Sequence, residues 1–440
     1  MKRLFASLLP LLLLSLPAHA QDAIAPALDK ADTAWMMIAC ILVLMMSLPG
    51  LALFYGGLVR KDNVLATLMQ TFAVAIVVSL IWPILCYSFA FTEGNRWLGN
   101  GSKILLNGVF PNSLTGTIPE SVFVFFQMTF AIITAAILLG SVADRIKFSA
   151  VLLFSTLWIV VVYTPVAHWV WGPSGLIGGA GDDAYTGLFG FGKALDFAGG
   201  TVVHITSGIA GMVAALVLGK SRYSNESTSN NLVLSVMGAS LLWVGWFGFN
   251  AGSALNSGTQ AGMAMLVTNS SAAAAGLVWM LLEWHLQGKP SVGGAISGVV
   301  AGLVAITPGA GFVSFGGALV MGMCGSAACY LSVAILKEKL GFDDTLDAFG
   351  IHGVGGIVGA ILTGVFASHS IGGTAGLLEG NVDQLWAQII SVLVVAAYTA
   401  CTTFLLLKFV QWVMGLRVAI EVEAEGLDLA LHGNKVHVYK

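Results

Sequence analysis

The chain has 440 residues, of which 57% are hydrophobic and only 9% are charged, with a formal net charge of −3. A soluble domain carries about 25% charged residues, so this sequence cannot cover a soluble globule of its size with charge. The composition excludes an ordinary cytosolic enzyme, a nucleic-acid-binding protein and a disordered regulator, and it indicates an all-α polytopic membrane protein.

The first twenty residues have the features of a secretory signal peptide. Lys2 and Arg3 form a short basic region, an apolar stretch follows at 8–16, and Ala18-His19-Ala20 matches the A-x-A cleavage pattern. The apolar stretch is shorter than the roughly 20 residues of a spanning helix. We expect a signal peptide at 1–20, with an uncleaved anchor as the alternative. Cleavage would leave the mature N-terminus outside a bacterial-type inner membrane.

Long apolar runs separated by short polar breaks predict eleven transmembrane helices. They lie at 33–56, 64–91, 121–143, 148–171, 198–219, 231–250, 260–286, 291–307, 312–336, 347–367 and 385–413. The transmembrane domain is therefore expected at 21–413, with a cytoplasmic tail at 414–440.

Lysine and arginine in the connecting segments orient these spans. Thirteen basic residues fall on the side of the C-terminus and four, Lys30, Arg96, Lys103 and Lys193, fall on the side of the mature N-terminus. Because basic residues accumulate in cytoplasmic loops, we expect the N-terminus outside and the C-terminus inside. This orientation requires an odd number of spans, as predicted.

A weak internal repeat connects the fifth and tenth spans. His204 and His352 are each followed by glycine four and seven residues later, and each is preceded by an acid, Asp196 and Asp347 respectively. The tenth span is five positions after the fifth, and because this displacement is odd, the two cross the bilayer in opposite directions. The pattern predicts an inverted repeat of five plus five spans with a site between the halves. The eleventh span lies outside the repeat.

Ionisable groups inside a membrane suggest function. A neutral imidazole has one donor and one acceptor nitrogen, so two facing histidines could line a narrow lumen and accept a proton. Alternatively, His204 and His352 are each satisfied by a backbone carbonyl group. A metal site is disfavoured because no third ligand stands at a recognisable spacing. Asp196 opens its span and is expected to cap the helix, and Asp347 invites the same interpretation.

Aromatic residues gather near the predicted outer ends of several spans, where their rings could hold a small cation with help from the hydroxyl of Ser253. These residues are Phe126, Phe130, Trp171, Trp246 and Phe249. The five cysteines all lie in apolar runs without a C-x-x-C spacing, so we expect buried free thiols and neither a disulfide framework nor a zinc site.

Several motifs resemble those of the ammonium transporter family (Amt/Mep/Rh), particularly its bacterial Amt branch. They are DFAGGTVVH at 196–204, WVGWFGFNAGS at 243–253, the run from Asp347 to Gly359, PGLALFYGG at 49–57 and ADRIKFS at 143–149. The resemblance covers essentially the whole mature chain. It implies a homotrimer of eleven-helix subunits, each with its own pore, and no cofactor.

The resemblance also implies roles for individual residues. Phe126, Trp171 and Ser253 match the outer recruitment site for ammonium, and Asp196 matches the acid that shapes its mouth. Phe130 and Phe249 match a stacked gate, and His204 and His352 match a pair of pore histidines. Four further residues fall in matching motifs and are expected to line the pore: Trp246, Asn250, Tyr163 and Thr307.

The implied mechanism is capture of ammonium, deprotonation near the mouth and passage of ammonia through an apolar lumen. The proton takes a separate polar path, so uptake is electrogenic. Because potassium cannot lose a proton, a dry pore rejects it. Three other functions are considered. An ammonium sensor usually carries an appended output domain, and an intramembrane hydrolase is disfavoured because no G-x-S-x-G or H-E-x-x-H motif is found. The third alternative is a neutral Rh-like gas channel.

The C-terminal tail resembles the family segment that packs beneath the trimer, where a PII-type signal protein commonly binds. The resemblance rests on GLRV at 415–418 and EGLD at 425–428. Ala419 replaces the proline usual after that valine, which puts the tail geometry and PII control in question. The acidic tail could also be a simple solvated terminus.

Overall fold

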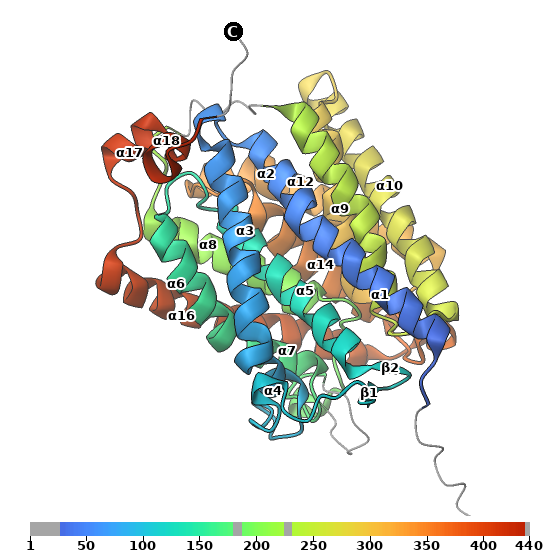
Figure 1. Ribbon diagram of the computed structural model, residues 1–440. Coiled ribbons are helices and arrows are strands. Elements are labelled where there is room, and N and C mark those ends of the chain that lie inside the picture. The colour runs from blue at the N-terminus through green and yellow to red at the C-terminus, as the bar shows by residue number, and fades with distance from the viewer. Residues whose placement is uncertain (1–26, 179–186, 224–230, 436–440) are drawn as a thin grey trace, which may run out of the picture.

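The computed structural model describes residues 27–178, 187–223 and 231–435 and is almost entirely helical (Figure 1). The proposed signal peptide lies outside these residues. In the described part, eleven helical segments are long and apolar enough to cross a membrane, which confirms the expected number of spans. They are Lys30–Leu58, Lys61–Phe91, Glu120–Leu139, Phe148–Trp171, Gly200–Leu218, Leu232–Gly252, Thr259–Gln287, Val292–Gly309, Phe315–Ala334, Phe349–Phe366 and Val382–Met414.

Six spans are built around one α-helix each: α5 (Glu120–Leu139), α9 (Leu232–Gly252), α10 (Thr259–Gln287), α11 (Val292–Ile306), α12 (Phe315–Leu331) and α16 (Val382–Met414). Three others consist of two α-helices joined by a π-helical turn: α1 (Lys30–Met45) with α2 (Ala52–Leu58), α3 (Val64–Ile81) with α4 (Tyr87–Phe91), and α6 (Phe148–Trp158) with α7 (Thr164–Trp171). Pro49 and Pro83 lie inside two of these turns, and Pro165 is the second residue after the third. A proline lacks the N–H of a regular helix, which accounts for the breaks.

The remaining two spans begin with a π-helical turn and continue as α8 (Thr206–Leu218) and α14 (Val354–Phe366). Short elements lie between the spans: α13 (Lys337–Leu340), α15 (His369–Gly372) and the antiparallel pair β1 (Leu114–Thr115) and β2 (Ile118–Pro119). Two more, α17 (Ile420–Glu425) and α18 (Leu427–His432), follow the last span.

The fifth and tenth spans cross at glycines. A Cβ atom added to Gly208 would lie 2.2 Å from the backbone nitrogen of Gly353, and one added to Gly356 would lie 2.9 Å from the carbonyl oxygen of Gly200. Gly200 thus meets Gly356, and Gly208 meets Gly353. The residue numbers rise along one span as they fall along the other, as expected for segments that run in opposite directions. Only glycine permits backbones to approach this closely.

We expect Gly208→Ala to destabilise the protein by about 1–3 kcal/mol, because the added methyl group overlaps backbone atoms that cannot rotate away. Gly262→Ala is the matched control, since Gly262 lies within α10 and a Cβ atom there meets nothing within 4 Å. Its stability should change by less than about 1 kcal/mol, in the favourable direction. Thermal unfolding of the detergent-solubilised proteins measures both. Equal melting temperatures for Gly208→Ala and wild type would contradict the close crossing.

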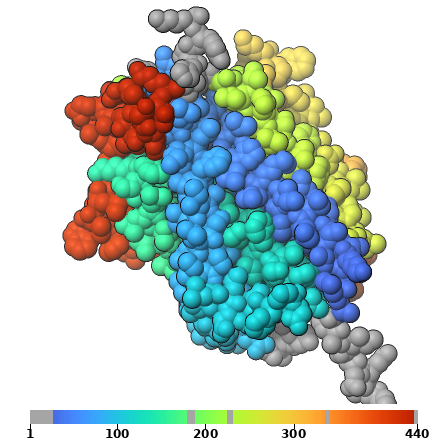
Figure 2. Space-filling model, in the orientation of Figure 1, coloured from blue at the N-terminus to red at the C-terminus, as the bar shows by residue number. Residues whose placement is uncertain are grey.

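The C-terminal segment folds back onto the loops at one end of the molecule (Figures 1 and 2). Glu423, which is 2% exposed, accepts hydrogen bonds from the Arg417 guanidinium group and from the backbone N–H of Arg222. Asp428, 3% exposed, accepts a 2.7 Å bond from the backbone N–H of Ala66, and burial raises the pKa of its carboxyl group. The solvated-terminus interpretation is therefore wrong for these two acids.

The cysteine prediction is correct in part. All five thiols are free, and Cys40, Cys86 and Cys329 are buried. Cys324 and Cys401 are exposed on spans instead. An apolar run does not distinguish a surface that faces lipid from one that faces another helix, because both are apolar.

Candidate functional site

An aromatic cavity of about 240 Å³ is lined by residues from the first half of α5 and the end of α7. Its lining includes three residues expected at the recruitment site, Phe126, Trp171 and Ser253. The indole N–H of Trp171 donates to the carbonyl oxygen of Asp196 at 2.8 Å, which fixes the ring. The Ser253 hydroxyl group donates to the carbonyl oxygen of Phe249 at 2.8 Å, so its own oxygen lone pairs remain available to a donor in the cavity.

Phe130 lines this cavity and stacks against Phe249 behind it. The rings of Phe130 and Phe249 stack with centroids 4.2 Å apart and planes inclined by 16°, and both side chains are buried. Phe130 also makes edge contacts with Phe126 and Trp171, at 4.8 Å and 5.8 Å between centroids. The stacked pair therefore lies between this cavity and His204.

The two histidines lie beyond the stacked pair and face one another. Their Nδ1 atoms are 3.1 Å apart and their ring centroids 5.2 Å apart. His204 also lies 5.9 Å from Phe249 and stacks on Trp246 at 5.4 Å. At this distance, one Nδ1 atom carries a hydrogen and donates a hydrogen bond to the other Nδ1 atom. The alternative in which each ring is satisfied by a carbonyl group does not describe this geometry.

Each histidine lies in a π-helical turn at the start of its span. His204 belongs to the turn Gly200–Ile205 and His352 to the turn Phe349–Gly353. Such turns re-aim a side chain relative to a regular α-helix and are frequent at functional sites. The exposed fractions of the two residues are 0% and 4%, so the surrounding protein excludes bulk water from them. The sequence contained no signal for these turns.

Asp196 caps the first of these turns. Its carboxylate accepts backbone N–H groups from Gly199, Thr201 and Val202 at 2.9–3.0 Å. Burial raises the pKa of this carboxyl group to about 6, although the N–H groups of Val202, Thr201 and Gly199 oppose the shift. The carboxylate thus serves the turn and does not point freely into the cavity.

The capping role expected for Asp347 is wrong, because Asp344 has it. Asp344 accepts backbone N–H groups from Ala348, Phe349 and Gly350 and the hydroxyl group of Ser141. Asp347 instead forms an ion pair with Lys337 at 2.7 Å. Counting positions would have found the true equivalent, since Asp196 precedes His204 by eight residues and Asp344 precedes His352 by the same number.

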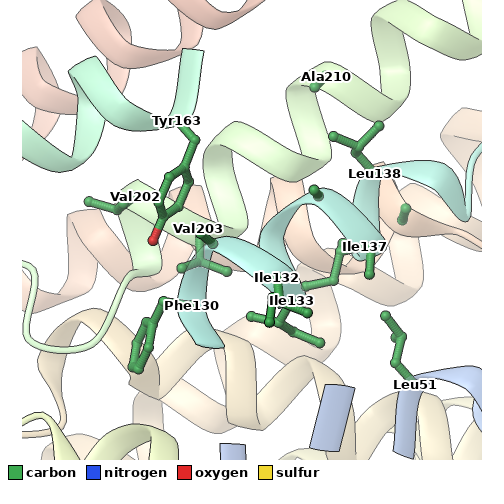
Figure 3. Close-up of a cluster of buried hydrophobic side chains, with 14 of the residues drawn as sticks. Leu51, Phe130, Ile132, Ile133, Ile137, Leu138, Tyr163, Val202, Val203 and Ala210 are labelled. Carbon is green, nitrogen blue, oxygen red and sulfur yellow. The ribbon is translucent and has the colours of Figure 1, made fainter. Parts of the chain in front are cut away.

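The four other residues expected to line the pore lie in the interior near the histidine pair and the stacked phenylalanines. Trp246 donates its indole N–H to the Thr307 hydroxyl oxygen at 2.9 Å, and Asn250 donates to the Thr268 hydroxyl oxygen at the same distance. Tyr163 is fully buried and lies close to Val202, Val203 and Phe130 (Figure 3).

One histidine that the sequence did not single out is equally buried. Both ring nitrogens of His168 in α7 lie within 3.0 Å of backbone carbonyl oxygens, those of Ala90 and Asn95. The residue holds the loop after α4 against the span that carries Trp171. In the described ranges, no group of three or more histidine, cysteine, aspartate or glutamate side chains could hold a metal ion.

Comparisons with known proteins agree with this geometry. The model of the Ammonium Transporter Family matches residues 34–437. The chain is 46% identical to an ammonium transporter of Bacillus subtilis over 93% of this chain and 99% of that one. It is 48% identical to an ammonium transporter of Aquifex aeolicus over 96% of each chain.

Solved structures are similar as well. Mep2 of Candida albicans has a TM-score of 0.80 at 32% identity, with 90% of this chain and 87% of that chain covered. A structure described as a sensor Amt protein has a TM-score of 0.82 at 28% identity, with 91% and 98% covered.

Proposed function

The chain belongs to the ammonium transporter family, whose members are transporters rather than enzymes, and we propose that it takes up ammonium by separating it into ammonia and a proton. Ammonium is recruited from outside by the ring faces of Phe126 and Trp171 and by the hydroxyl oxygen of Ser253. Cation–π attraction and the available oxygen lone pairs compensate for the water that the ion loses.

The column Phe130–Phe249–His204–His352 is the observation that carries this proposal. All four side chains are buried, and consecutive rings are 4.2–5.9 Å apart. Such a path offers an ion no replacement for its hydration shell, so a charged species meets a high barrier. Ammonia has no net charge and crosses after the stacked phenylalanines part.

The proton follows a separate polar route, which shares the histidine pair with the path of ammonia. The two imidazoles share one hydrogen between their Nδ1 atoms. When one ring takes up a proton at its Nε2 atom, the shared hydrogen moves to the other ring, which releases its own Nε2 hydrogen, so the donor and the acceptor exchange roles. Ammonia and the proton leave together on the inner side, so each cycle moves one positive charge. Trp246, Asn250, Tyr163 and Thr307 line or support this path.

We extend the proposal to the setting of the pore. The N-terminus lies outside a bacterial inner membrane after removal of residues 1–20, and the C-terminus is cytoplasmic. The five-plus-five inverted repeat is supported by the opposed crossing at Gly208 and by the matched acids Asp196 and Asp344. Three subunits assemble, each with its own pore. The ordered tail near Glu423 and Asp428 offers a face to a PII-type protein despite Ala419.

Charge movement in proteoliposomes tests the proposed function. An ammonium pulse should evoke an inward current, whereas an equal potassium pulse and protein-free vesicles should not. A pH-sensitive dye inside the vesicles shows whether a proton accompanies ammonia, because ammonia that enters alone makes the lumen alkaline. Ammonia entry without current would indicate a neutral gas channel. Correctly folded protein that gives neither signal would contradict transport and favour a sensor.

A further inference from the structure

An ion pair lies behind the wall of the outer cavity. Glu120 is the first residue of α5 and pairs with Lys103 of the loop after α4. The hydroxyl group of Tyr87 in α4 also donates to the Glu120 carboxylate, at 2.6 Å. The glutamate side chain is 5% exposed and the lysine side chain 33%. The negative partner is therefore enclosed by protein, while the positive partner reaches solvent.

Three aromatic rings connect this ion pair to the cavity. The ring of Tyr87 contacts those of Phe91 and Phe123, with centroids 6.0 Å and 6.4 Å away, and the latter two rings meet edge to face at 5.1 Å. Phe91 and Phe123 both line the outer cavity. Glu120 precedes Phe126 of the expected recruitment site by six residues, which is about 9 Å along a helix. The ion pair thus lies next to the side chains that form the cavity wall.

A charge at this position acts on a cation in the cavity. Packed aromatic side chains screen a charge much less than water and dissolved salt do. An unpaired lysine here would repel ammonium, and an unpaired glutamate would attract it. Because Glu120 is enclosed and Lys103 is partly solvated, the field of the carboxylate is the less screened of the two. The pair as a whole therefore favours a cation in the cavity.

We propose that Glu120 and Lys103 determine electrostatically how tightly the outer cavity holds ammonium, although neither is among the residues that line it. This inference rests on the proposed function. Glu120 attracts the cation and also cancels the charge of Lys103, and Lys103 in turn limits the attraction. A carboxylate in the first turn of a helix also stabilises that helix. The experiment must therefore separate the effect of charge on recruitment from an effect on folding.

Glu120→Gln and Lys103→Met test the proposal in the full-length protein reconstituted in proteoliposomes. Glu120→Gln leaves the lysine uncompensated, and we expect the ammonium concentration that gives half-maximal current to rise about fivefold. Lys103→Met leaves the carboxylate uncompensated, and the same concentration should fall about threefold. The double variant carries neither charge and should lie within about twofold of wild type. The maximal current should stay within about twofold in all three variants, because deprotonation and passage occur beyond the cavity.

Tyr87→Phe is the matched control, because it removes the hydroxyl donor to Glu120 and leaves the ring and both charges in place. It should lower the melting temperature and keep the half-maximal concentration within about twofold of wild type. Lys289→Met removes an exposed lysine from the loop after the seventh span, at the opposite end of the molecule from α4 (Figure 1), and should change neither property. If Glu120→Gln does not fold, Lys103→Arg and Lys103→Met provide the comparison, since only the second changes the charge.

A purely structural role predicts that both single variants weaken recruitment and that the double variant is worse than either. That pattern would overturn the proposal, and so would an unchanged half-maximal concentration in both folded single variants. The proposed function fails differently, because the wild-type protein itself would then give no ammonium current.

Discussion

Replacing both His204 and His352 by alanine should abolish selective ammonium transport. The two imidazoles fill the column beyond Phe249 and share a hydrogen at 3.1 Å between their Nδ1 atoms. Their removal leaves room for water in a segment that the wild-type protein keeps narrow. A hydrated lumen conducts potassium as readily as ammonium, and a lumen that collapses conducts neither.

Currents evoked by equal pulses of ammonium chloride and potassium chloride measure this effect. The ratio of ammonium to potassium current should fall by at least about tenfold, which corresponds to about 1.4 kcal/mol of lost discrimination, or the ammonium current should disappear. His168→Gln is the buried-histidine control, because the ring nitrogens of His168 are bonded to backbone carbonyl oxygens at the end of α4 and in the loop that follows it. It should retain the wild-type ratio. A double variant with unchanged flux and selectivity would show that the pair is structural.

The sequence was sufficient for the arrangement of spans because the bilayer imposes a length and an apolar composition on each of them. It was also sufficient to single out His204 and His352, since the same glycine spacing follows both. The shortest predicted span, at 291–307, corresponds to Val292–Gly309 in the structure. Hydropathy therefore succeeded even where the apolar run was shortest.

The wrong predictions concern positions that only the three-dimensional structure determines. Asp347 is the nearest acid to its span, but the π-helical turn moves the free N–H groups into reach of Asp344 instead. Cys401 lies in an apolar run that faces outward.

Because Asp196 and Asp344 cap equivalent turns, a comparison of the two can separate a contribution of Asp196 to transport from its contribution to stability. Asp196 and Asp344 each accept three backbone N–H groups of a π-helical turn. An asparagine keeps one acceptor oxygen but turns an NH₂ group toward the remaining donors. Because a hydrogen bond to a charged group contributes about 1.5–3 kcal/mol, Asp196→Asn and Asp344→Asn should destabilise the protein by similar amounts, which thermal unfolding can compare.

Transport should distinguish the two variants. The carbonyl group of Asp196 also holds the Trp171 indole at 2.8 Å, so a disturbed turn displaces a wall of the outer cavity. Asp344 lies at the opposite turn and has no residue of that cavity among its partners. We therefore expect Asp196→Asn to raise the half-maximal ammonium concentration. The current should fall by at least about tenfold, which corresponds to about 1.4 kcal/mol. Asp344→Asn should lower the current without changing the half-maximal concentration. Identical changes in both variants would mean that Asp196 contributes to the pore only as a helix cap.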